Sequence, residues 1–161
     1  MMARIKLLIP DKKIFSLRIP VRITDINYGN HVGNDALVSI VHEARMQWLA
    51  TGKYSEMNIG GPGLIMSDLA VEYKAESFYG DILSINIAVG EVQKKSFEVY
   101  YEITAERSGK DVVIAKAKSG MVCYDYGAKK VSAMPEEFET FLHLTEELFM
   151  NSKSSNFPLP V

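Results

Sequence analysis

Polar side chains that could take part in acid–base chemistry gather in one stretch of the sequence. They are Asp25, Asn27, His31, Asn34 and Glu43. A carboxylate or an imidazole can act as a general base towards water, and an amide can hold that water or polarise a carbonyl group by hydrogen bonding. The stretch is therefore suited to bind a carbonyl group or an anion and to bring a nucleophile to it.

The elements on either side of this stretch predict how it is positioned. Apolar and polar residues alternate from Phe15 to Thr24, as in a half-buried strand, and Pro20 favours an edge strand. Apolar residues then recur at helical spacing from Leu37 to Trp48, and Gly52 ends the run. Because the first N–H groups of a helix lack partners inside the helix, a polar loop leading from a strand into a helix can bind a carbonyl oxygen or an anion.

The loop and the helix together resemble a known signature. In hotdog-fold acyl thioesterases of the 4-hydroxybenzoyl-CoA thioesterase type, the pattern Asp-x-Asp-x-x-Gly-His-Val-Asn-Asn precedes a helix that carries Glu-x-Ala-Arg. The matching residues here are Asp25, Asn27, His31, Asn34 and Glu43-Ala44-Arg45. The resemblance covers the whole chain in outline, because Gly80-Asp81 falls where those proteins begin their second long strand and Met134-Pro135 where their last strand ends.

The sequence departs from that signature at two places. Asn27 stands where many family members have an aspartate that is often assigned to catalysis, and Asn30 is an extra residue between Gly29 and His31. The resemblance implies a hotdog fold and hydrolysis of an acyl thioester of coenzyme A or of an acyl carrier protein. Two alternatives on the same fold stay open: a protein that binds acyl thioesters or other small ligands without hydrolysis, and a dehydratase, for which the typical pattern is not evident.

Most of the candidate catalytic residues also have a structural alternative. Asp25 could act as a general base or attack directly, or it could form a turn after the strand. The amides could hold water or the thioester, although Asn34 at a helix start is a common capping residue. His31 could contact the substrate or shape the loop. Glu43 is expected on the buried helix, either as a reserve candidate for the base or in a salt bridge with a residue such as Arg22.

A second set of residues is expected to bind the substrate. These are Tyr28, Gly33, Gly61, Gly63 and Lys74. The N–H groups at the start of the helix would polarise the thioester carbonyl, and the glycine-rich segment 60–63 could let the backbone approach a ligand or form a plain loop. Lys74 is a candidate for binding the phosphates of coenzyme A.

The rest of the chain is predicted to form an antiparallel sheet and a C-terminal helix. The strands are expected at Leu64 to Tyr73, Ile82 to Val92, Phe97 to Ala105 and Val113 to Cys123. A loop of Ser108-Gly109-Lys110 would join the last two strands and place Glu102 opposite Lys116. The helix is expected from Pro135 to Phe149, followed by a loose tail over residues 151–161. We therefore predict one α+β domain over residues 1–150, with a curved sheet wrapped around one long central helix.

Composition limits the classes of function. With 161 residues, of which 47% are hydrophobic, the chain can bury its own core as one domain. The net charge of −2 and the scattered basic residues argue against nucleic-acid binding. Because zinc spacings, nucleotide-binding motifs and long apolar stretches are not evident, we expect no metal, cofactor or membrane insertion and a cytoplasmic location. Cys123 is expected to be a buried strand residue rather than a nucleophile.

The predicted sheet has an edge, and an unpaired strand edge favours association. We therefore expect a homodimer or a dimer of dimers. The strand Leu64 to Tyr73 and the Gly60 to Gly63 loop would bring the second copy to the site, because one small domain wrapped on a helix leaves little room for an acyl chain and its carrier.

Overall fold

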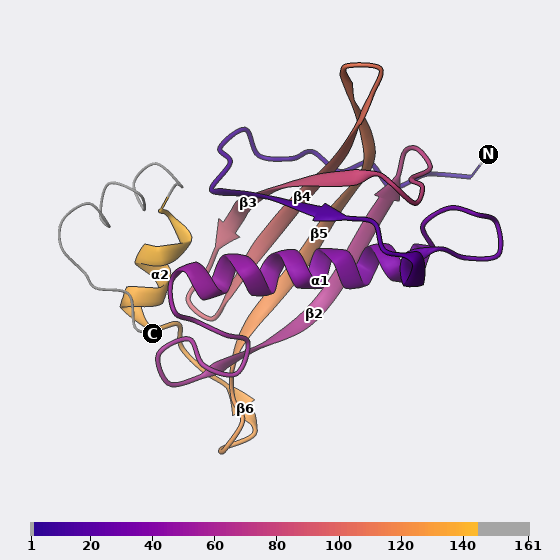
Figure 1. The fold of residues 1–161 in the computed structure, drawn as a ribbon. Helices are drawn as coiled ribbons and strands as arrows, with labels where there is room; N and C mark the ends of the chain where they lie inside the picture. Colours follow the sequence, from indigo (N-terminus) through magenta and orange to yellow (C-terminus); the bar gives the residue numbers. More distant parts are fainter. Residues whose placement is uncertain (1, 145–161) are drawn as a thin grey trace, which may run out of the picture.

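The computed structural model describes residues 2–144, which form an antiparallel sheet and two α-helices (Figure 1). The strands are β1 (Phe15–Pro20), β2 (Gly63–Tyr73), β3 (Ile82–Val92), β4 (Ser96–Arg107), β5 (Lys110–Asp125) and β6 (Lys130–Val131). The helices are the short 3-10 helix η1 (Ile23–Asp25), the long α1 (Asn34–Thr51) and α2 (Glu136–Leu142). The predicted α+β architecture is confirmed.

The sheet has the strand order β1-β3-β4-β5-β2, and every pair of neighbours is antiparallel. The short β6 pairs with the end of β5. β1 and β2 are therefore the two edges, and the edge position predicted from Pro20 is confirmed. Within residues 2–144, one side of β2 is left without a partner strand.

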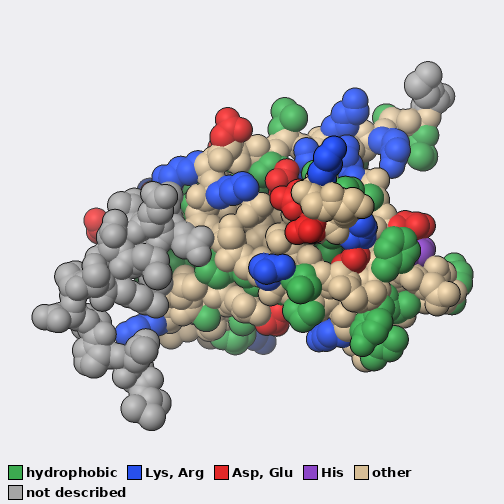
Figure 2. All heavy atoms as spheres, turned by 45° about the horizontal axis from the view of Figure 1, so that its top comes forward, with side chains coloured by type: hydrophobic (Ala, Val, Ile, Leu, Met, Phe, Trp, Pro, Cys, Tyr) green, Lys and Arg blue, Asp and Glu red, His purple; other side chains and the backbone are tan. Residues whose placement is uncertain are grey.

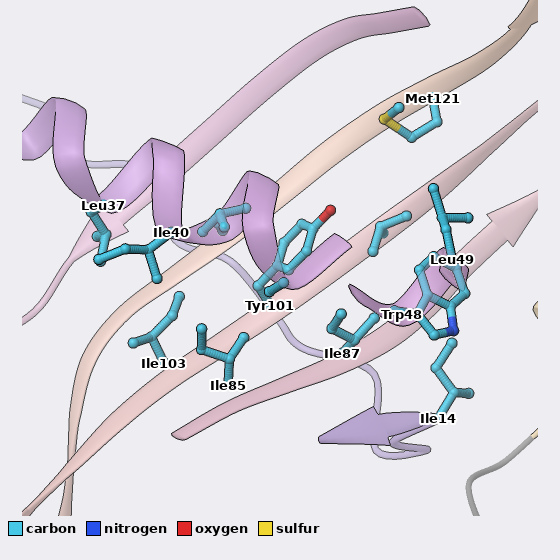
Figure 3. Close-up of a cluster of buried hydrophobic side chains, with 14 of the residues drawn as sticks. Ile14, Leu37, Ile40, Trp48, Leu49, Ile85, Ile87, Tyr101, Ile103 and Met121 are labelled. Atoms are coloured by element: carbon cyan, nitrogen blue, oxygen red, sulfur yellow. The ribbon is translucent and has the colours of Figure 1, made fainter. Parts of the chain in front are cut away.

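Helix α1 lies against one face of the sheet (Figure 1). Its apolar side chains, such as Leu37, Ile40 and Leu49, are buried. Leu37 and Ile40 face Ile85 and Ile103 of the sheet (Figure 3). Burying one large aliphatic side chain is worth roughly 1.5–3 kcal/mol, so contacts of this kind fix the helix on the sheet. The loop before α1 is positioned as a consequence.

The first strand ends earlier than its sequence pattern suggests. β1 stops at Pro20, and the next residues turn into η1, which contains Asp25. The expectation that Asp25 lies at the end of the strand is therefore wrong, because the short helical turn η1 lies between β1 and the loop and Asp25 is its last residue.

The β4–β5 hairpin confirms the predicted pairing but not the predicted loop. Its loop is Ser108 and Gly109 alone, both at positive φ (51° and 75°), as expected for the two-residue turns whose twist matches that of the strands. A bulge at Ile114 then shifts the register by one residue. Glu102 consequently lies opposite Lys116, as predicted.

α2 covers the C-terminal end of α1, where Phe141 stacks on Trp48 with ring centroids 5.3 Å apart. A Cβ atom at Gly52 would lie 2.6 Å from the Phe141 ring, so the residue that ends α1 must be small. α2 begins at Glu136, one residue after the predicted start at Pro135, which is its N-cap. α2 ends at Leu142, with His143 as its C-cap, so the prediction that the helix continues through residues 143 and 144 is wrong. The rest of the predicted helix, residues 145–149, and the expected tail 151–161 lie outside the described residues.

Cys123 is a buried strand residue, as predicted. Its side chain is completely buried in β5, and burial raises the pKa of its thiol to about 11. A neutral, inaccessible thiol is a poor nucleophile. No helix in residues 2–144 has both the length and the apolar character that crossing a membrane requires.

Candidate active site

The carboxylate of Asp25 is held by Arg22. Asp25 is 4% exposed, and it accepts hydrogen bonds from the backbone N–H (2.8 Å), Nε (3.2 Å) and Nη2 (2.9 Å) of Arg22. Burial by itself would raise the pKa of this carboxyl, but the hydrogen bonds and the charge of Arg22 hold the pKa below its ordinary value. The geometry favours the structural alternative, in which Asp25 closes the turn before the loop.

The loop after Asp25 is a small hairpin. Ile26 and Val32 form an isolated bridge, and the N–H of Asn27 donates to the carbonyl of His31 at 2.9 Å. The turn between them is closed by the N–H of Asn30, which donates to the carbonyl of Asn27. Asn30 has a φ of 62°, a left-handed conformation that asparagine tolerates. The extra residue in the signature is thus absorbed by a tight turn.

The side chains of this hairpin are closely packed. Oδ1 of Asn27 accepts the N–H of Gly29 at 2.8 Å, which forms an Asx turn. A Cβ atom at Gly29 would lie 3.0 Å from Nε2 of His31 and 3.3 Å from Oδ1 of Asn27. The absence of a side chain at Gly29 therefore lets the imidazole lie against the turn.

His31 is half-buried beside a carboxylate. Its Nδ1 lies 3.2 Å from the carbonyl oxygen of Val32, and its Nε2 lies 3.9 Å from Oε1 of Glu76. Glu76 belongs to the segment that follows β2, which is tied to the loop because the N–H of Val32 donates to the carbonyl of Ser77 at 2.8 Å. Sequence reasoning missed Glu76, because no pattern links it to a histidine so distant in the chain.

A cavity of about 250 Å³ opens at this point, beside the start of α1. It is lined by His31, Val32, Asn34, Leu37, Tyr73, Lys74, Ala75, Glu76, Ser77 and Ile114. The structure thus brings together three residues predicted from the sequence, His31, Asn34 and Lys74. Apolar side chains gather at this end of the molecule (Figure 2), where Tyr28, Phe78 and Tyr79 are exposed. We call this cavity the α1 entrance pocket.

Helix α1 begins without a side-chain cap. Its N-cap residue is Gly33, so the capping role considered for Asn34 is wrong. The N–H of Gly33 donates to the carbonyl of Asp25 at 2.9 Å and is engaged within the loop. Asn34 is the first helical residue, and its carbonyl accepts the hydroxyl of Tyr73 at 3.0 Å. Burial, and then the charge of Asp35, raise the pKa of that hydroxyl, which keeps it a donor at neutral pH.

Four other residues predicted for the site, Glu43, Tyr28, Gly61 and Gly63, lie outside the α1 entrance pocket. Glu43 is exposed, and its Oε1 accepts Nε2 of Gln47 at 2.7 Å, so the expectation that this acid is buried is wrong. Tyr28 is fully exposed and does not line the α1 entrance pocket. Gly61 precedes β2 and Gly63 begins it, so both glycines lie at the opposite end of that strand from Tyr73.

A second cavity, of about 220 Å³, lies further along α1. Its lining combines apolar residues with a partly buried ion pair, in which Nε of Arg45 donates to Oε1 of Glu56 at 2.7 Å. Arg45 also donates to the hydroxyl of Tyr101 at 3.2 Å, and Nε2 of His42 lies 3.0 Å from Oε2 of Glu56. The backbone carbonyl of Glu56 accepts the N–H of Leu64. The arginine of the helix signature therefore joins α1 to the start of β2.

The described residues offer few ligands for a metal ion. Within residues 2–144, no group of three or more His, Cys, Asp and Glu side chains is arranged to hold one. The titratable groups in the lining of the α1 entrance pocket are an imidazole, a carboxylate, a phenol and an ammonium group.

Comparisons with known proteins point to one family. The family model described as the thioesterase-like superfamily matches residues 21–142. The 1,4-dihydroxy-2-naphthoyl-CoA hydrolase of Synechocystis is 24% identical over 129 residues, which cover 78% of this chain and 92% of that protein. The corresponding hydrolase of Nostoc punctiforme is 25% identical over 134 residues, which cover 80% of this chain and 86% of that protein.

A solved structure has the same fold. It is a variant of 4-hydroxybenzoyl-CoA thioesterase complexed with 4-hydroxybenzoyl-CoA, with a TM-score of 0.72 at 14% identity over 80% of this chain and 97% of that one. The hotdog fold expected from the loop signature is thereby confirmed. Because the family model spans most of the chain, the protein belongs to the thioesterase-like superfamily.

Proposed function

We propose that the protein hydrolyses acyl-CoA thioesters at the α1 entrance pocket. The observation that carries this proposal is the meeting of His31, Asn34 and Lys74 on one pocket at the start of an uncapped helix. The coenzyme A thioesters named for the Synechocystis and Nostoc relatives support the same class of substrate. Such a substrate is also in keeping with the cytoplasmic location that we expect.

The pocket offers a group for each part of the reaction. The first N–H groups of α1 have no side-chain cap and can donate to the thioester oxygen as it becomes negatively charged. The imidazole of His31 can take a proton from water as the water oxygen bonds to the acyl carbon. Collapse of the tetrahedral intermediate then breaks the carbon–sulfur bond. The leaving sulfur takes the proton back from His31, and the products are a free acid and a thiol.

Lys74 is placed to meet the carrier part of the substrate. Its Nζ lies 3.0 Å from Oε1 of Glu72, at the rim of the pocket. The ammonium group itself is exposed and can exchange its carboxylate partner for a phosphate, because ion pairs at the surface are weak. We propose that Lys74 binds a phosphate of coenzyme A.

We propose further that two copies share the site through β2, whose outer edge has no partner strand within residues 2–144. If two copies of β2 pair antiparallel about their middle residue, Gly63 of one copy lies opposite Tyr73 of the other. The segment with Gly61 and Gly63 would then lie next to the partner's α1 entrance pocket. This arrangement reconciles the predicted substrate contacts of these glycines with their distance from the pocket within one chain.

The second candidate function is acyl-thioester binding without turnover, and it is favoured by Asn27. The amide of Asn27 is fixed in an Asx turn beside His31, where many family members have an aspartate. A hydrolase and a binding protein differ in one measurement, the release of free thiol.

The test is an assay of thiol release from short-chain, long-chain and aromatic acyl-CoAs without added metal or nucleotide. We expect hydrolysis of at least one of them well above the rate without protein. If no substrate releases thiol while acyl-CoAs raise the Tm, the binding function replaces the hydrolytic one. Specific activity should also fall on dilution in step with the dimer fraction measured by sedimentation, and a fully active monomer would contradict the shared site.

A further inference from the structure

The proposed hydrolysis leaves the position of the attacking water undefined. The two acids predicted as bases do not line the α1 entrance pocket, because Asp25 is bound by Arg22 and Glu43 is exposed next to Gln47. Among the described residues, the titratable side chains that line this pocket are His31, Tyr73, Lys74 and Glu76. Glu76 is the one carboxylate in that set.

The hydrogen bonding of His31 fixes its tautomer. Nδ1 lies 3.2 Å from the carbonyl oxygen of Val32, and a carbonyl oxygen can only accept a hydrogen bond. The hydrogen of the neutral imidazole is therefore on Nδ1, and Nε2 carries a lone pair. Nε2 is also the atom that faces Glu76.

Two acceptors thus face each other across 3.9 Å, the Nε2 of His31 and the Oε1 of Glu76. This separation is too long for a direct hydrogen bond and suits a bridging water. We propose that His31 and Glu76 together hold the water that attacks the thioester. The water donates one O–H bond to each acceptor, which leaves an oxygen lone pair free to bond to the acyl carbon.

The proton transfer is balanced within the pair. As the water oxygen bonds to the acyl carbon, Nε2 of His31 takes one proton and the imidazole becomes an imidazolium. The carboxylate of Glu76, which accepts the other O–H bond, stabilises that imidazolium by its charge. When the carbon–sulfur bond breaks, the proton on Nε2 passes to the leaving sulfur, and both side chains return to their starting state.

The backbone around Glu76 is held firmly. Nη2 of Arg107 donates to the carbonyl of Glu76 at 3.3 Å, and the guanidinium pairs with Asp81 at 2.7 Å. Oδ2 of Asp81 accepts the hydroxyl of Ser77 and the N–H of Phe78. The guanidinium also lies 5.8 Å from the centroid of the Phe78 ring. These contacts fix the segment that presents Glu76 to His31, although the Glu76 side chain itself is exposed.

The role of Glu76 rests on the proposed function, and the first experiment tests that role separately from hydrolysis itself. Glu76→Gln keeps the size of the side chain but replaces one acceptor oxygen with a donor, so kcat for hydrolysis should fall by about 10–100-fold with KM within twofold. Glu76→Asp should recover part of this loss. Glu139→Gln, an exposed acid on α2, is the matched control and should keep wild-type kinetics.

A second nucleophile distinguishes a water-holding role from a merely structural one. Hydroxylamine attacks thioesters with less help from a base than water needs, so Glu76→Gln should form the hydroxamate at close to the wild-type rate while hydrolysis is slow. The hydroxamate-to-acid ratio, after subtraction of the reaction without protein, should rise about tenfold or more. An equal fall of both rates would show that Glu76 acts on structure, and an unchanged kcat would show that it does not hold the water.

The tautomer gives a readout that does not depend on activity. Nitrogen-15 chemical shifts of the imidazoles, assigned with a His31→Gln variant, should show the hydrogen of His31 on Nδ1 in the free protein. A hydrogen on Nε2 would overturn the inference even if the wild type is active. If the wild type releases no thiol from any acyl-CoA, the proposed function fails and the inference fails with it.

Discussion

The two ends of helix α1 are built from different kinds of side chain. At its C-terminal end, Trp48, Tyr54, Phe138 and Phe141 form a cluster in which Tyr54 meets Phe138 edge to face, with centroids 5.0 Å apart. At its N-terminal end, the α1 entrance pocket of about 250 Å³ is lined by polar and apolar groups. One end is filled by the chain's own aromatic rings, and the other is left open.

This contrast shows how one helix serves two purposes. Aromatic burial at the closed end supplies stability and fixes the helix against the sheet. At the open end, the helix leaves its first N–H groups uncapped and its neighbouring residues half-exposed, which lowers stability but leaves groups that can bind a substrate. Substitutions at the open end should therefore change catalysis, and substitutions at the closed end should change folding.

The largest effect is expected for His31→Ala. Removing a general base that contacts the attacking water should lower kcat/KM by about 10²–10⁴-fold, while the Tm stays close to that of the wild type because the side chain is half-exposed. Steady-state kinetics and thermal unfolding of the same samples measure both quantities. His143→Ala, an exposed histidine after α2, is the control and should change neither. A large fall in Tm for His31→Ala would remove the contrast between the two ends.

The opposite result is expected for Phe138→Ala. The ring is fully buried and also meets Phe97, with centroids 5.6 Å apart, so its removal leaves a cavity between α2 and the sheet. The free energy of unfolding should fall by about 3–5 kcal/mol, as measured by urea denaturation. The kcat of the fraction that remains folded should stay within twofold of the wild type. A loss of kcat in fully folded protein would show that the closed end also takes part in catalysis.

The closed end and the sheet could be predicted from the sequence because their patterns are local. Alternation indicated the strands, and Gly52 indicated the end of α1 because glycine commonly follows the last turn of a helix. The pairing of Glu102 with Lys116 was also predicted, although the turn before it was not. The bulge at Ile114 compensates for the shorter turn, and a bulge leaves little trace in a sequence.

The open end could be predicted only in part because it is assembled from segments far apart in the chain. The loop signature identified His31 and Asn34, but it could not show that Arg22 occupies the carboxylate of Asp25. The meeting of His31 with Glu76 depends on the segment after β2, which is placed by backbone hydrogen bonds and by Arg107. Contacts of this kind follow from the fold and not from residue spacing.

A smaller effect is expected for Asp25→Asn, and it should depend on pH. The folded-state pKa of Asp25 lies below the ordinary value, so its ion pair stabilises the protein at neutral pH, and this contribution is lost as the pH falls through the folded-state pKa. The variant should have a Tm about 2–6 °C lower at pH 7. The gap should begin to close as the pH falls towards about 4, the ordinary range for an aspartate, and should vanish only below the folded-state pKa, where the wild-type carboxyl is protonated too. Asp111→Asn, in the exposed β4–β5 hairpin, is the control.

Activity adds a second criterion to the Asp25 experiment. Because its carboxylate is occupied by Arg22, folded Asp25→Asn should retain kcat within about tenfold of the wild type, less than the loss of a general base causes. A fall of two orders of magnitude with an unchanged Tm would instead make Asp25 the base. In that case the open end would contain a second catalytic centre within the loop itself.

The smallest effect is expected for Glu43→Gln. Glu43 lies on α1 between the two ends but on its exposed face, and its described partner is the neighbouring Gln47. The substitution keeps the length and shape of the side chain, and a surface contact of this kind contributes only about 0.2–0.5 kcal/mol. The kcat/KM should therefore stay within twofold of the wild-type value, and the free energy of unfolding should stay within about 0.5 kcal/mol of it. Loss of turnover in a folded Glu43→Gln protein would mean that the exposed face of α1 forms part of the site, which a second copy of the chain would then have to complete.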